Sequence, residues 1–265
     1  MLNRSSLYRH IIEISMGVIR KMPQKPRYTF SSTDREPSPR NRKTLTEISL
    51  VILLLVITLA ASMYKGQPIY IFGYIMAIVY VIGRVTHKNR PFQELGLKRG
   101  FVKDFKKIWY YFGIDAILFQ LLPPILGIAF VLGDYTAVLN DITGRLAINF
   151  GSLSGVYAVG GLLAAALILT LMEEVVFRVA IQERLSWFIG TPLAIIFTTV
   201  LFGSIHFVGT TGLTPAAILD VVGVMLDGLF FGIIYAKTHN LAVTWITHYI
   251  ADTMGIFFIV MLSML

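Results

Sequence analysis

Long apolar stretches separated by short polar segments fill this 265-residue chain from about residue 47 onward. Seven of them reach about 16–25 residues, the length that a helix needs to cross a bilayer. They lie at 47–64, 68–83, 108–132, 156 onward into LMEEVVFRVA (171–180), 191–208, 214–236 and 241–264. The pattern predicts an all-α fold: a polytopic transmembrane helical bundle of about seven spans with amphipathic surface helices.

The first 46 residues follow another pattern. Residues 1–22 place apolar side chains at helical spacing among basic ones, which indicates an amphipathic surface helix. Residues 23–46 carry Pro, Ser and Arg without periodicity and are typical of a linker. We therefore predict a basic extension and linker over 1–46 and a membrane-embedded domain over 47–265. A further surface helix is predicted within 84–107.

The charges fix an orientation. The net charge is +8, yet only 14% of the residues are charged and 55% are hydrophobic. With a cytoplasmic N-terminus, 21 of the 23 Lys and Arg fall on the cytoplasmic side. We expect a multi-pass cell-membrane protein whose basic segments contact the lipid bilayer and not nucleic acid. The absence of cysteine excludes disulfides, Cys-ligated metals and a thiol nucleophile.

Ionisable side chains inside the predicted spans are the strongest functional signal. Each costs several kcal/mol in hydrocarbon unless it is paired or hydrated, so each marks a candidate site. The candidates are Asp115, Glu173, Glu174, Arg178, His206, Asp220, Asp227, His248 and Asp252.

Distances along the chain group four of them. The turn signal at Gly190 predicts a helical hairpin, with Glu173 lying 17 residues before it and His206 lying 16 residues after it. Equal distance from the turn means equal depth, so these two side chains can face each other. His248 lies at a similar depth on the last span, with Asp252 one turn further on the same face. Three helices thus deliver acids and histidines to one layer.

The remaining charges have simpler interpretations. Glu174 and Arg178 form an i, i+4 pair, which we expect to be a neutralised supporting pair near the membrane interface, about 100° around the helix from Glu173. Asp115, Asp220 and Asp227 either line a hydrated path or bond to neighbouring helices, and we favour the second.

Three segments resemble one family. EEVVFR (173–178) fits EExxxR, FGSIH (202–206) fits FxxxH and HYIAD (248–252) fits Hxxx(N/D). In this order and placement they resemble the CPBP family of intramembrane proteases, also called Abi or CAAX protease-like. The resemblance covers roughly residues 92–264. Members include the eukaryotic CAAX prenyl endoprotease and bacterial proteins linked to bacteriocin immunity and peptide maturation.

The resemblance implies hydrolysis of a peptide bond by a glutamate-activated water. By position, Glu173 is the expected base and His206 helps to hold the water, while His248 and residue 252 stabilise the oxyanion. Members often have Asn at the last position, and an ionised Asp252 cannot donate a hydrogen bond. Either Asp252 is protonated in its apolar site or it orients His248, and we favour the second.

Several alternatives stay open at this point. Glu173, His206 and His248 are zinc ligands by type, so a metalloprotease and a metal-free glutamic mechanism both fit. The expected partner is a membrane-associated peptide or protein in a bacterial membrane; whether it is prenylated is not predicted, nor is an oligomeric state. A proton-coupled transporter and a non-catalytic immunity or scaffold protein are the competing functions.

Overall fold

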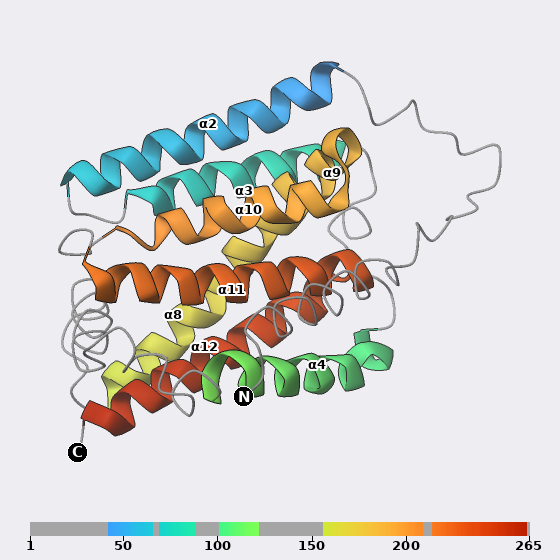
Figure 1. The fold of residues 1–265 in the computed structure, drawn as a ribbon. Helices are drawn as coiled ribbons and strands as arrows, with labels where there is room; N and C mark the ends of the chain where they lie inside the picture. The colour runs from blue at the N-terminus through green and yellow to red at the C-terminus, as the bar shows by residue number, and fades with distance from the viewer. Residues whose placement is uncertain (1–41, 66–68, 88–100, 122–155, 209–213, 264–265) are drawn as a thin grey trace, which may run out of the picture. The chain divides into compact units, whose positions relative to one another are not determined.

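The computed structural model describes residues 42–65, 69–87, 101–121, 156–208 and 214–263, and the regular elements in these ranges are all helices (Figure 1). They are α2 (Arg42–Lys65), α3 (Tyr70–His87), α4 (Phe101–Asp115), the π-helix η1 (Ala116–Leu121), α8 (Val156–Glu174), the π-helix η2 (Val175–Gln182), α9 (Glu183–Ile189), α10 (Thr191–Ile205), α11 (Pro215–Thr238) and α12 (Leu241–Ser263). The predicted all-α class is confirmed. These helices belong to one compact unit, residues 40–265.

The surface of the bundle is apolar. Large hydrophobic side chains are exposed along α2, α3, α10 and α11, for example Leu50, Phe72 and Val200, each more than half exposed. Contiguous apolar surface of this extent needs lipid as its solvent. Two helical segments, Thr44–Lys65 and Ala217–Thr238, are long and apolar enough to cross a bilayer, and Tyr70–Gly83 and Thr191–Ile205 are shorter apolar helices. The count of seven spans stays a prediction.

The boundaries of the helices follow local chemistry. Gly190 adopts a positive φ of 83°, and α10 starts directly after it with Pro192 in its first turn, so the predicted hairpin turn is present. At the start of α11 the Thr214 side chain accepts a hydrogen bond from the Ala217 N–H at 3.1 Å. Between α11 and α12 the Asn240 side chain accepts from Ala242 in the same way.

One predicted boundary is wrong. A surface helix ending at 107 and a separate span from 108 were expected, but α4 runs across this point and continues into η1. The helix is amphipathic: Lys106 and Lys107 are exposed while the next residue, Ile108, is fully buried. A basic face and a buried face therefore share one helix. The predicted extension up to residue 41, most of the segment 84–107 before α4 and the expected kink at Pro123-Pro124 lie outside the described residues.

The segment that carries the first motif lies at the centre of the bundle. α2 packs beside α3, α10 beside α11, and α12 against both α4 and α8 (Figure 1). The π-helix η2 contacts α2, α3, α10, α11 and α12, and all eight of its residues are buried. Side chains from five helices therefore fix its position.

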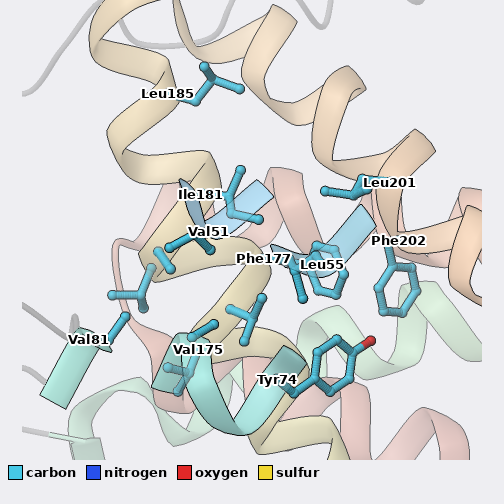
Figure 2. Packing of buried hydrophobic residues seen from close by; sticks show 14 of the residues in the cluster. Val51, Leu55, Tyr74, Val81, Val175, Phe177, Ile181, Leu185, Leu201 and Phe202 are labelled. Carbon is cyan, nitrogen blue, oxygen red and sulfur yellow. The ribbon is translucent and has the colours of Figure 1, made fainter. Parts of the chain in front are cut away.

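Aromatic rings join η2 to its neighbours. Phe177 on η2 lies edge-on to Tyr74 of α3, with ring centroids 6.0 Å apart, and edge-on to Phe202 of α10 at 5.2 Å. Figure 2 shows these rings with the aliphatic side chains of Leu55 and Val175 around them. Edge-to-face contacts of this kind have a preferred geometry, so they set the ring orientations as well as fill space.

Glycines let α10 and α11 approach closely. A Cβ atom at Gly228 would lie 2.8 Å from the Phe202 ring, and one at Gly203 would overlap the Met225 side chain. Small residues at such contacts are typical of helix pairs in membranes. These contacts place Phe202 against α11.

Candidate active site

Glu173 and Glu174 stand at the junction of α8 and the π-helix η2. The wider turn is visible in the hydrogen bond from the Glu183 N–H to the Arg178 carbonyl oxygen, five residues back. π-helical turns are rare and occur mostly at functional sites. Glu174 is fully buried, whereas the side chain of Glu173 keeps 14% of its surface exposed.

Glu174 begins a line of buried polar groups along this helix. The Arg178 Nε donates to Glu174 Oε2 at 3.1 Å, and the Arg178 Nη1 donates to Gln182 Oε1 at 3.4 Å. Gln182 in turn donates to the carbonyl oxygen of Gly232 on α11 at 2.9 Å. A Cβ at Gly232 would lie 3.1 Å from Gln182 Oε1, so a residue without a side chain permits this approach. The line anchors the motif helix to α11.

His248 of α12 connects both carboxylates. Its Nδ1 lies 2.9 Å from Glu174 Oε1, and because an ionised carboxylate only accepts, Nδ1 carries the proton. The other ring nitrogen, Nε2, lies 3.7 Å from Glu173 Oε2 and 3.5 Å from Asp252 Oδ1. These are ion-pair separations and too long for strong hydrogen bonds. Nε2 thus faces two carboxylates, one on each of two helices.

Two aromatic rings hold the imidazole of His248. Phe231 stacks on it with centroids 4.3 Å apart and an interplanar angle of 25°, and Phe202 lies 5.9 Å away, edge-on. The ring is therefore constrained at Nδ1, on one face and at one edge.

His206 joins the site through Phe202. It caps the end of α10, is half-buried, and packs its ring 5.1 Å from that of Phe202. Its Nδ1 lies 3.1 Å from the Phe202 carbonyl oxygen, which assigns the proton to Nδ1 and leaves Nε2 as the acceptor nitrogen. The hairpin thus brings His206 to the ring that also touches His248.

The predicted Glu174–Arg178 pair forms, and both of its side chains are fully buried in the bundle. Asp252 was expected to orient His248, yet Glu174 lies closer and at the protonated nitrogen, while the Asp252 side chain is 44% exposed. The i+4 spacing on α12 brings Asp252 only to Nε2, and α8 crosses α12 at the opposite side of the ring.

Asp115 and Asp227 also differ from expectation. Bonding to neighbouring helices was favoured, but neither carboxyl oxygen of the fully buried Asp115 has a hydrogen-bond partner in the structure, nor does Oδ1 of Asp227. Asp115 occupies the last position of α4, where the π-helix η1 begins. Asp220 is half-buried.

The described residues do not form a metal-ligand set. No three His, Asp or Glu side chains within them are grouped so that they could hold a metal ion together. Of the three ligand candidates, His206 turns Nδ1 to a backbone carbonyl, and Glu173 Oε2 lies 3.7 Å from His248 Nε2. The arrangement of the described residues therefore does not fit a zinc site.

The sequence interpretation missed Gln182, Phe202 and Phe231. Gln182 continues the i+4 series that begins with Glu174 and Arg178, so the spacing could have identified it. Phe202 is the first residue of the FxxxH motif, so the motif marked its position although no role was assigned to it. Phe231 had no signal, because aromatic residues are frequent in any apolar helix.

The comparisons with known proteins concern the same region. Residues 155–254 match the family described as type II CAAX prenyl endopeptidase Rce1-like. The match contains all three motifs and is narrower than the 92–264 expected from them. No curated protein and no solved structure matches the chain. The resemblance drawn from the motifs is confirmed over residues 155–254, where the chain is similar to the CAAX protease-like family.

Proposed function

We propose that this protein is an intramembrane endopeptidase that hydrolyses a peptide bond of a membrane-associated peptide or protein, with Glu173 activating the water. The observation that carries the proposal is the separation of 3.7 Å between Glu173 Oε2 and His248 Nε2, in a site where Glu174 and Arg178 hold His248 from behind. The family match supports protease chemistry at the level of the family.

The proposed reaction starts with a water between Glu173 and the histidines. A water molecule about 2.8 Å from each atom can bridge the gap between Glu173 Oε2 and His248 Nε2. Glu173 removes a proton as the water oxygen attacks the carbonyl carbon of the scissile bond. His206, with Nδ1 turned to the Phe202 carbonyl, accepts a hydrogen bond at Nε2 from the other O–H of the water and orients the attack.

The tetrahedral intermediate needs a donor for its oxyanion. His248, when protonated at Nε2, supplies it, and Asp252 at 3.5 Å balances the charge of the ring. When the intermediate collapses, the C–N bond breaks and Glu173 returns its proton to the leaving amine. The products are a carboxylic acid and an amine, and Glu173 is ionised again. The acid then loses its proton to the amine or to solvent.

We place the protein in a bacterial cell membrane as a multi-pass chain with a cytoplasmic N-terminus. The distribution of Lys and Arg supports this orientation. In it, the α9–α10 hairpin and the connection between α11 and α12 lie on the cytoplasmic side. Substrates would then reach Glu173 from the cytoplasmic half of the bilayer.

The proposal is tested by comparing membrane-peptide profiles of cells that carry the wild type or Glu173→Gln. We expect one or more peptides to accumulate uncleaved in Glu173→Gln cells, and the same peptides in His248→Ala cells. Glu183→Gln is the matched control, since Glu183 lies on the same helical segment, is 32% exposed and pairs with His239 away from the site. A biological phenotype and profile that survive Glu173→Gln, His206→Ala and His248→Ala would favour a non-catalytic scaffold instead.

A further inference from the structure

The hydroxyl of Tyr74 is a buried polar group that forms no hydrogen bond of full geometry with any residue that the structure describes. The side chain has no exposed surface, and its oxygen is unpartnered in the structure. Leaving a buried donor unsatisfied costs free energy, and such groups are few in native proteins. A phenylalanine would fill the same space without that cost. Packing alone therefore does not explain the presence of the hydroxyl at this position.

The hydroxyl belongs to the neighbourhood of the proposed base. The Tyr74 side chain interacts with the Glu173 carboxyl both electrostatically and through a weak hydrogen-bond contact, although the hydroxyl forms no hydrogen bond of full geometry. Its ring contacts Phe177, which contacts Phe202, the ring shared by His206 and His248. Figure 2 shows the oxygen at the edge of the hydrophobic cluster, turned away from the aliphatic side chains of Val81 and Val175.

The backbone that carries Tyr74 is held rigidly. A Cβ on the preceding residue, Gly73, would overlap the Thr58 side chain, so α2 and α3 approach closely at this point. The Tyr70 N–H donates to the Ser62 hydroxyl at 2.7 Å, which ties the start of α3 to α2. Tyr74 therefore presents its hydroxyl at a fixed position, and any adjustment falls to Glu173.

We propose that Tyr74 is a positioning residue for Glu173, whose carboxylate accepts a hydrogen bond from its hydroxyl when Glu173 turns toward the water. The inference rests on the proposed function. A phenol is suited to this role because it donates to a carboxylate without forming a salt bridge that would hold it permanently. Hydrogen bonds in active sites are often long before substrate binds and shorten in the complex. Since α3 lies outside the matched residues 155–254, the site extends beyond the family segment.

The test uses Tyr74→Phe in the full-length protein. The probe is the peptide whose level differs most between wild-type and Glu173→Gln membranes. We expect kcat to fall about 10- to 100-fold, as for the loss of a hydrogen bond to a charged group, with KM unchanged. The unfolding temperature should be unchanged or higher, because the lost hydroxyl had no partner.

Tyr80→Phe on the same helix is the matched control. The Tyr80 hydroxyl donates to Glu47 at 2.6 Å and accepts from Arg184 at 2.9 Å, away from the site. The Tyr80→Phe variant should have a lower unfolding temperature and an unchanged kcat, which is the reverse of the result expected for Tyr74→Phe.

The inference is overturned if Tyr74→Phe keeps the wild-type kcat, or if its loss of rate lies in KM or in folding. Those outcomes leave the proposed function intact. If Glu173→Gln cleaves as fast as the wild type, or if no peptide differs, the proposed function itself fails.

Discussion

His248 is the residue on which the site depends most directly. Glu174 fixes its protonated nitrogen, Phe231 covers one face, and Nε2 faces Glu173 and Asp252. The first motif therefore contributes two acids with different environments. Glu174 is fully buried and contacts Nδ1 of the imidazole, and Glu173 is partly exposed and lies on the side of Nε2.

Arg178→Met tests the buried pair. The change leaves the Glu174 carboxylate buried without its cation, so the free energy of unfolding should fall by about 3–5 kcal/mol. The exposed Lys237→Met, a comparable loss of charge, should change it by no more than about 0.5 kcal/mol. Denaturant or thermal unfolding in detergent micelles measures both. Equal stability of the two variants would contradict the structural role of the pair.

Treatment with a chelator tests whether cleavage depends on a metal ion bound by these side chains. Because the described acids and histidines form no three-ligand group, we expect full peptide cleavage after treatment with a zinc chelator, with elemental analysis to verify that metal is absent. Loss of activity that returns with added zinc would overturn this expectation.

At the scale of elements, the contact between α10 and α11 controls the geometry of the site. It depends on glycines, and Gly228 faces the ring of Phe202, which lies between the two histidines. A shift of the Phe202 ring would therefore move both His206 and His248.

Gly228→Ala should accordingly destabilise the protein and slow cleavage. The added methyl group would lie 2.8 Å from the Phe202 ring, and overpacking of this kind costs about 1–3 kcal/mol. Gly223→Ala on the same helix is the control: its Cβ meets open space, so helix propensity should stabilise it by up to about 1 kcal/mol. Unfolding curves and cleavage rates are the measurements. A Gly228→Ala protein that matches the control on both counts would refute this view of the contact.

The helices and their contacts can be compared with what the sequence predicts. The apolar runs predict nearly every described helix, and the turn at Gly190 and the spacing of Glu174 and Arg178 predict real contacts. Periodicity assigns a residue to a face of its own helix and says nothing of which helix lies opposite. This is why Asp252, on the same helix as His248, was expected to orient the imidazole. The residue at His248 Nδ1 is Glu174, which comes from another helix. The π-helix and the place of Tyr74 follow from packing among several helices, which no local pattern encodes.

At the scale of the whole molecule, the polarity is that of a membrane protein. Large apolar side chains cover the outside of α2, α3, α10 and α11, while the ionisable groups meet in the interior. The chain contains no cysteine, so single introduced thiols report their location without background.

The orientation can be measured in this way. With a cytoplasmic N-terminus, Lys65→Cys should react with a membrane-impermeant thiol reagent on intact cells, because it follows the first span. Lys237→Cys should react only after the cells are made permeable. Both positions are exposed in the structure, so a difference reflects sidedness. The opposite pattern would invert the proposed topology.

The central claim is that Glu173 activates water to cleave a peptide bond. The most direct measurement is cleavage of the accumulated peptide by purified protein in oxygen-18 water, with wild type and Glu173→Gln side by side. We predict one oxygen-18 atom in the new carboxyl group and a rate that falls at least about 100-fold in Glu173→Gln. Cleavage by Glu173→Gln at the wild-type rate would contradict the account.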